Sequence, residues 1–179
     1  MRRPPVKISV ERLFSHDVDT IEIDERLALR GDLKERYPKG VRVGAKISKI
    51  SRGVFVEGVV DGVERETCVR CLEPFHRSTH VEIAEPYSED VKAEDAQFSD
   101  VAPLIDREID LDALVSELLE VDEPMAAVCG EACLGICPVC GANRNLERCT
   151  CSNRARATEV EVRDSPFAGL AKFIQERES

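Results

Sequence analysis

Hydrophobic and polar residues alternate along most of the first 84 residues, a pattern typical of strands that bury one face of a sheet. The clearest segments are residues 6–10, 41–48, 54–60, 63–69 and 75–83. Asp61-Gly62 separates two of them and favours a two-residue hairpin turn. The pattern predicts an antiparallel sheet of about five or six strands, either open or curled into a small barrel.

A helical spacing follows further along the chain. Asp110 can cap a helix that runs to about Glu120. Apolar residues recur there at i, i+3, i+4, i+7 and i+8, namely Leu111, Leu114, Val115, Leu118 and Leu119. We expect this face to pack against the core. The segment before it, 85–105, is acidic and poor in apolar residues, and it predicts a flexible loop.

These elements predict an α+β protein with five parts. They are an antiparallel β domain over 1–84 that carries the first C-x2-C, an acidic flexible loop over 85–105, an amphipathic helix over 106–123, a cysteine-rich module over 124–152, and a linker with a short C-terminal helix over 153–179. Ser165-Pro166 can begin that last helix, which is too short to be stable without docking.

Every cysteine has a close partner in the sequence. The pairs are Cys68/Cys71, Cys129/Cys133, Cys137/Cys140 and Cys149/Cys151. Structural zinc takes four tetrahedral ligands, and two thiolates two residues apart can bind it from one tight turn. In the segment 137–141, CPVCG, the proline fixes φ and the glycine can adopt a positive φ. The eight cysteines therefore predict one or two structural zinc ions.

The spacing leaves open how the four pairs combine. Short loops close with the smaller loss of entropy, which favours 137/140 with 149/151 and 68/71 with 129/133. Disulfides and free buried thiols are the alternatives. The N-terminus lacks an apolar segment of signal-peptide length and no run reaches the length of a membrane span, so we expect a cytoplasmic protein and no membrane partner. His76 and His80 could replace cysteine ligands, although two exposed histidines on one strand face are the plainer interpretation.

Composition and charge narrow the class of partner. The chain has 179 residues, 42% hydrophobic and 4% aromatic with no Trp, which predicts a core of Val, Ile and Leu. The net charge is −10, and residues 82–123 contain 15 acidic and 2 basic residues. Such a chain has no general attraction for nucleic acid and suits a basic protein better. Four arginines near the cysteines could neutralise metal–thiolate charge or contact phosphate: Arg144, Arg148, Arg154 and Arg156.

No catalytic motif is present in the sequence. There is no phosphate-binding glycine loop, no HExxH and no GxSxG, and no carboxylate pair is singled out. We therefore expect a protein that is not an enzyme.

Three segments together resemble one known family. They are CVRCLEPF at 68–75, EIDLDALVSELL at 108–119 and CGEACLGICPVCGANRNLERCTC at 129–151. The chain resembles the YceD-like large ribosomal RNA subunit accumulation proteins, which have bacterial and chloroplast members, and SPFAGLAKF extends the likeness. Arg144 departs from the pattern, where a more apolar residue is expected. The resemblance implies a role in the accumulation or processing of 23S ribosomal RNA, with a structural metal.

Three hypotheses follow from these observations. The first is a non-enzymatic, zinc-stabilised factor for large-subunit biogenesis, whose partner is a basic ribosomal protein or an assembly factor. The second is a zinc ribbon that binds ribosomal RNA directly through the four arginines. The third is a redox-switched zinc chaperone. In the redox-regulated heat-shock chaperones C-x-C comes before C-x-x-C, whereas this chain has the reverse order. The oligomeric state stays open.

Overall fold

A computed structural model describes residues 4–151, in which the chain forms two compact units. Within the described residues, the first unit comprises 4–68 and 73–129, and the second comprises 69–72 and 130–151. The predicted linker and C-terminal helix, 153–179, lie outside the described residues, as do Arg154 and Arg156.

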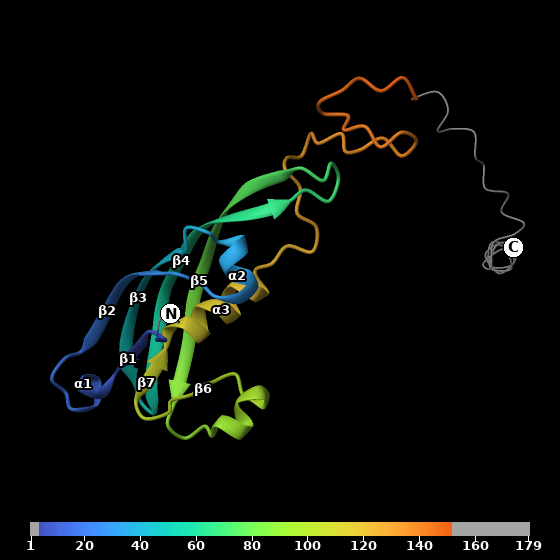
Figure 1. Ribbon diagram of the computed structural model, residues 1–179. Helices are drawn as coiled ribbons and strands as arrows, with labels where there is room; N and C mark the ends of the chain where they lie inside the picture. The colour runs from blue at the N-terminus through green and yellow to red at the C-terminus, as the bar shows by residue number, and fades with distance from the viewer. Residues whose placement is uncertain (1–3, 152–179) are drawn as a thin grey trace, which may run out of the picture. The chain divides into compact units, whose positions relative to one another are not determined.

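The first unit is built on an open five-stranded sheet with the order β2-β3-β4-β5-β6 (Figure 1). Its strands are β2 (Thr20–Leu27), β3 (Val41–Ile50), β4 (Gly53–Thr67), β5 (Pro74–Ser88) and β6 (Ala102–Pro103). All neighbours are antiparallel except β5 and β6, and a separate ribbon pairs β1 (Lys7–Ser9) with β7 (Glu108–Asp110). The predicted α+β class is confirmed. The barrel alternative is wrong, because among residues 4–151 strands β2 and β6 are the two edges of this sheet.

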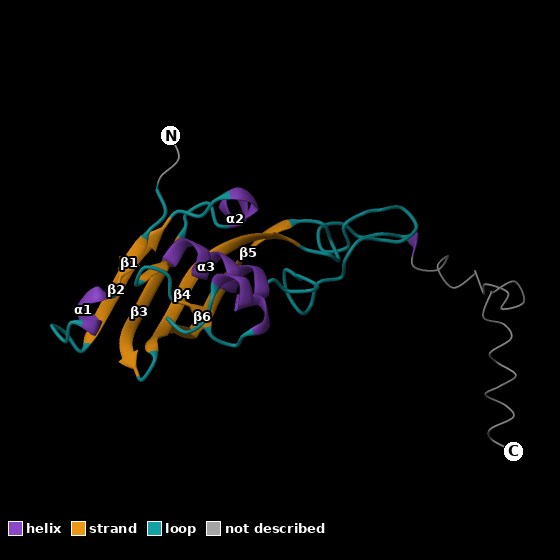
Figure 2. Cartoon of the chain, turned by 90° about the horizontal axis from the view of Figure 1, so that it is seen from below, coloured by secondary structure: helices purple, strands orange, loops and turns teal. Residues whose placement is uncertain are grey.

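One amphipathic helix covers a face of this sheet. Helix α3 (Leu111–Val121) lies across the strands (Figure 2), and the Asp110 carboxylate caps it by accepting a hydrogen bond from the Ala113 amide at 3.0 Å. Its buried side chains are Leu111, Leu114, Val115 and Leu119. The predicted helix, its cap and its apolar face are confirmed. The smaller helices are α1 (Glu11–Phe14), α2 (Gly31–Arg36) and the 3-10 turn η1 (Ala93–Phe98).

Aliphatic side chains dominate the core of the first unit, as the composition predicts. Residues of β3 alternate between buried and exposed over Val41 to Ile47, so one sheet face packs inward. Tyr37 is the only aromatic residue among the fully buried side chains of the described chain. Its hydroxyl lies 3.2 Å from that of Thr79, which satisfies both buried groups.

The predicted hairpin turn at Asp61-Gly62 is wrong. Strand β4 continues through both residues, and Gly62 pairs with Thr79 of β5. A Cβ atom on Gly62 would lie 2.8 Å from Cγ1 of Val41 and 3.2 Å from the Tyr37 ring. Close packing in the middle of the strand therefore requires glycine at this position. Local sequence does not distinguish such a glycine from one in a turn.

Part of the acidic segment 85–105 is regular structure and not loop. Strand β5 continues to Ser88, whose carbonyl accepts a hydrogen bond from the Leu104 amide at 2.8 Å. Tyr87 pairs with Ala102 of β6, and Leu104 is buried. Pairing with a neighbouring strand and burial of these residues order a segment whose composition favours a loop.

A buried carboxylate ties two strands and one helix together. Glu64 of β4 is completely buried, and Arg77 of β5 donates to its Oε2 at 2.7 Å from Nη2 and 3.1 Å from Nε. Nε of Arg36 in α2 donates to Oε1 at 2.7 Å. Asp122 and Glu123, which follow α3, bind the same two arginines at 3.1 and 3.0 Å. Alternation along the strand predicts that Glu64 and Val63 lie on opposite faces of the sheet. It does not predict that the face with Glu64 is buried.

Across residues 4–151, no helix is both long enough and apolar enough to cross a membrane.

Candidate metal centre

Four sulfur atoms of the second unit meet within 4.8 Å of one another. They belong to Cys137, Cys140, Cys149 and Cys151, and Sγ of Cys149 lies 3.3 Å from that of Cys137 and 3.5 Å from that of Cys140. A tetrahedral zinc ion with Zn–S bonds of about 2.3 Å places its sulfurs about 3.8 Å apart. The spacing and the all-thiolate donor set therefore fit one zinc ion.

A tight turn brings Cys137 and Cys140 together. Gly141 has a φ of 74°, which places it in the left-handed region and confirms the role predicted for it. Its amide donates to the Cys137 carbonyl at 2.9 Å, and the Cys137 amide donates to the Ala142 carbonyl at 2.8 Å. The turn follows from the CPVCG sequence.

The same turn aims backbone amides at sulfur. The amides of Cys140 and Val139, followed by the hydrogen bond with Cys149, lower the pKa of Cys137 to about 6. At Cys149 the amide of Cys151 favours the thiolate, but the hydrogen bonds with Cys137 and Cys140 outweigh it and raise the pKa to about 12. The Cys149 thiol thus retains its proton, and a bound cation would take the place of that proton.

The other four cysteines form a second group with the same sulfur spacing. Sγ atoms of Cys68, Cys71, Cys129 and Cys133 lie within 4.8 Å of one another. The first two lie in the turn that joins β4 to β5, where the Cys68 amide donates to the Glu73 carbonyl at 2.9 Å. Cys68 and Cys71 are buried, whereas Cys129 is exposed.

The two C-x2-C turns share a backbone feature. Leu72 follows Cys71 with a φ of 63°, and Gly141 follows Cys140 with a φ of 74°. Leucine in the left-handed region costs on the order of 1 kcal/mol, so the surrounding turn must hold it there. The positive φ after the second cysteine is thus common to both groups although only one has glycine.

The grouping matches the pairing with the shorter loops, and it includes no histidine among the described residues. His80 is exposed and lies 2.7 Å from Asp61 through Nδ1. His76 is exposed as well. The two histidines are surface residues of β5, and the alternative in which they replace cysteine ligands has no support in this arrangement.

Asn145 is a residue of the site that the sequence interpretation missed. Its Oδ1 accepts from the Leu134 amide at 2.8 Å, while its Nδ2 donates to Sγ of Cys133 at 3.4 Å and to Oδ1 of Asn143 at 3.0 Å. Hydrogen bonds of this kind orient ligands and tune the charge on sulfur. The sequence does contain a signal for it, because Asn143 and Asn145 form an N-x-N motif between the Cys137/Cys140 and Cys149/Cys151 pairs.

The second unit lacks an apolar core in its described part. Within residues 69–72 and 130–151, the buried hydrophobic residues are Cys71 and Cys137 alone. Its larger apolar side chains are exposed, namely Val69, Leu72, Leu134, Ile136, Val139 and Leu146. A segment of this size without a core depends on cross-links such as a metal ion.

Two of the four arginines fall within the described residues. Arg144 and Arg148 are both exposed, so they are available to solvent or a partner. Another arginine has a structural contact: Nη1 of Arg70 donates to the carbonyls of Glu131 and Cys133 at 3.4 Å each.

Comparison with known proteins identifies the family. Residues 56–174, more than half of the chain, match the family described as Large ribosomal RNA subunit accumulation protein YceD. The chain belongs to the YceD family. The match begins in β4 and includes all eight cysteines and α3.

Individual relatives are similar over shorter stretches. An uncharacterized protein of Mycobacterium tuberculosis is 30% identical over 98 residues, which cover 54% of this chain and 47% of that protein. The Large ribosomal RNA subunit accumulation protein YCED homolog 1, chloroplastic, of Arabidopsis thaliana is 31% identical over 72 residues, or 40% of this chain and 21% of its own. The protein of that name from Zea mays is 38% identical over 53 residues, or 29% and 18%.

The chain spans about half the length of the mycobacterial relatives that it matches. No solved structure matches it.

Proposed function

We propose that this chain is a non-enzymatic, zinc-stabilised cytoplasmic factor required for the accumulation of 23S ribosomal RNA and for large-subunit biogenesis. The observation that carries the proposal is the family match over residues 56–174, together with the printed names of the plant relatives. The β domain serves as scaffold, and its partners are basic ribosomal proteins or assembly factors.

Two observations support structural zinc. Each group provides four thiolates, which fill a tetrahedral shell and leave no open position for a substrate. The described part of the second unit buries no apolar side chain besides cysteine, so a metal would supply the cross-linking that a core supplies elsewhere.

Native mass spectrometry and metal analysis of the reduced full-length protein test the zinc. We expect two zinc ions per chain, and one in Cys137→Ser, because serine is a poor zinc ligand. The first unit has its own core, so Cys137→Ser should keep the β-sheet circular dichroism. Thr150→Ala, an exposed change between two ligands, is the matched control and should retain both ions. Two ions in Cys137→Ser, or none in the wild type, would overturn the zinc assignment.

Depletion of the protein in its own cells tests the ribosomal role. We expect the ratio of 23S to 16S ribosomal RNA to fall and to be restored by the wild type and by Thr150→Ala, but not by Cys137→Ser. An unchanged ratio after depletion would refute the proposed function whatever the metal content.

Exposed Arg144 and Arg148 favour a second candidate, direct RNA binding by the cysteine-rich unit. Binding to a 23S fragment should then weaken with salt, and neutralising either arginine should reduce the log–log salt slope by about one. Binding that ignores salt, or that survives loss of both arginines, would exclude this candidate.

A further inference from the structure

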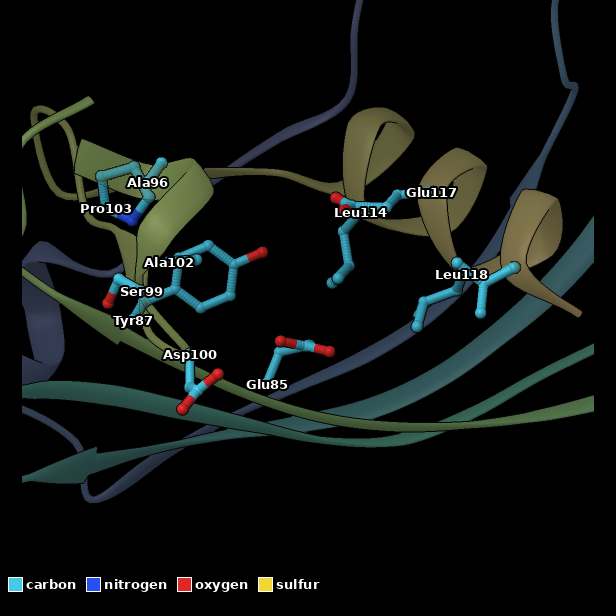
Figure 3. A pocket seen from close by; sticks show the side chains of 11 residues that line it. Glu85, Tyr87, Ala96, Ser99, Asp100, Ala102, Pro103, Leu114, Glu117 and Leu118 are labelled. Carbon is cyan, nitrogen blue, oxygen red and sulfur yellow. The ribbon is translucent and has the colours of Figure 1, made fainter. Parts of the chain in front are cut away.

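A cavity of about 410 Å³ lies in the first unit between α3, the end of β5 and the segment that leads into β6 (Figure 3). Helix α3 contributes Leu114 and Leu118 to one wall, and Tyr87 of β5 lies across from them. Val121 belongs to the lining as well and is 81% exposed. The cavity therefore offers uncovered apolar surface next to the core.

Carboxylates complete the lining. Glu85 comes from β5, Asp100 from the segment before β6, and Glu117 from α3. The described residues of the lining include no Lys, Arg or His. These three side chains have no ion pair or hydrogen bond with any other described residue, in contrast to the paired acids Asp24, Glu64 and Glu108. Three carboxylates without a described cationic partner thus line a cavity whose other walls are apolar.

Two of these carboxylates, Glu85 and Glu117, also act on the phenol of Tyr87. Burial, followed by the negative charges of Glu85 and Glu117, raises the pKa of its phenol to about 12. The cavity therefore disfavours a further negative charge and favours a positive one. Residues 82–123, with 15 acidic against 2 basic residues, extend that attraction beyond the cavity and would accelerate encounter with a cationic partner.

We propose that this cavity docks a basic segment of a partner polypeptide through a lysine or arginine flanked by an aliphatic residue. The methylene stem and the aliphatic neighbour would contact Leu118 and Val121, while the cationic head would lie among Glu85, Asp100 and Glu117. Metal ions or free polyamines would use the carboxylates but leave the apolar wall uncovered. The inference deepens the proposed function, on which it rests for the nature of the partner.

Fluorescence anisotropy with the full-length protein tests the site. The probe is a fluorescein-labelled peptide of twelve alternating lysines and leucines. Glu85→Gln/Glu117→Gln should weaken its binding about tenfold, as expected when two carboxylates that face one bound cation are removed. The matched control is Glu82→Gln/Glu120→Gln, which makes the same change in net charge on the same strand and helix but outside the cavity. We expect the control to change affinity by less than about twofold.

Val121→Ser separates a docking groove from a simple cation site. Because Val121 is exposed, this change should leave the unfolding midpoint unaltered while weakening the lysine–leucine peptide several-fold. Equal losses in the two charge variants would overturn the proposal. Displacement of the peptide by spermidine at equal concentration would also overturn it, because the cavity would then hold a polyamine. So would a dimer of the free protein that Val121→Ser dissociates, because the cavity would then hold a second copy. A failure in this binding assay leaves the ribosomal RNA ratio after depletion unaffected, so the two proposals fail separately.

Discussion

The side-chain amide of Asn145 donates a hydrogen bond to Sγ of Cys133 at 3.4 Å. Asn145 belongs to the loop between Cys140 and Cys149, so a residue enclosed by one cysteine group supports a sulfur of the other group. Its Oδ1 is occupied by the Leu134 amide at 2.8 Å, which holds the Nδ2 group toward the sulfur. The two groups are therefore connected by more than the chain.

Asn145→Ala should weaken zinc retention by the group that contains Cys133. Loss of a hydrogen bond to a ligand typically lowers metal affinity by about 10- to 100-fold. Competition with a chromogenic chelator should show one of two zinc ions released more readily. Glu147→Ala changes an exposed residue of the same loop and should release both ions as the wild type does. Identical release from Asn145→Ala and the wild type would contradict this role.

Gly141→Ala should weaken zinc binding by the other group. Space around Gly141 is open, so the cost comes only from its φ of 74°, about 1 kcal/mol or roughly a fivefold loss of affinity. Gly130 also has open space around it but no positive φ, so Gly130→Ala is the matched control and should bind zinc normally. Equal affinities of the two variants in the chelator competition would exclude backbone strain as the cause.

Glu64→Gln should lower the free energy of unfolding by about 3 kcal/mol, because it removes the charge that two largely buried arginines share. Urea denaturation followed by circular dichroism measures the change. Glu57→Gln, on the same strand, removes an exposed carboxylate 3.8 Å from Lys46 and should cost less than about 0.5 kcal/mol. A similar cost for the two variants would show that the buried network contributes little.

Acid should destabilise the first unit through Glu64. Burial opposes ionisation of Glu64, but hydrogen bonds from Arg77 and Arg36 outweigh it and hold its pKa below the ordinary value. A carboxyl whose pKa is lower in the folded state stabilises that state above its unfolded pKa, and the stabilisation disappears as pH falls through the folded pKa. The loss is therefore expected to begin below about pH 5, near the ordinary carboxyl pKa, and to grow as the pH falls through the lower folded pKa.

The other groups around Glu64 set the size of this effect. Burial, then the charge of Glu64, raises the pKa of Glu66, and acid relieves that penalty and offsets part of the loss. Asp122 and Glu123 bind the same arginines, and Tyr37 lies nearby. Urea midpoints measured from pH 7 to pH 3 should decline less in Glu64→Gln than in the wild type. Parallel declines would assign acid sensitivity to other carboxylates.

Local sequence was sufficient for the elements whose signals are local. The spacing of Leu111 to Leu119 and the cap at Asp110 predict α3, because a helix is stabilised within itself and by one face. Cysteine spacing likewise predicts the turn of Cys137 and Cys140, including the positive φ of Gly141, because a C-x2-C turn closes over four residues.

Long-range packing decided the rest. Asp61-Gly62 has the sequence of a turn, yet pairing with β5 and the ring of Tyr37 make Gly62 part of a strand. Glu64 is polar, yet Arg36 and Arg77, distant in sequence, cover it. These outcomes depend on which segments meet, and no local pattern contains that information.

Local patterns were thus enough to predict the α+β class, the amphipathic helix, the tight cysteine turns and the family resemblance. The division of the eight sulfurs into two groups of four, and the hydrogen bond from Asn145 to Cys133, became known from the folded chain. The fold also brings acidic residues 85, 100 and 117 into the lining of one cavity with apolar side chains. Periodicity and spacing act over one or two turns of chain, whereas groups brought together from distant segments are selected by the free energy of packing the whole fold.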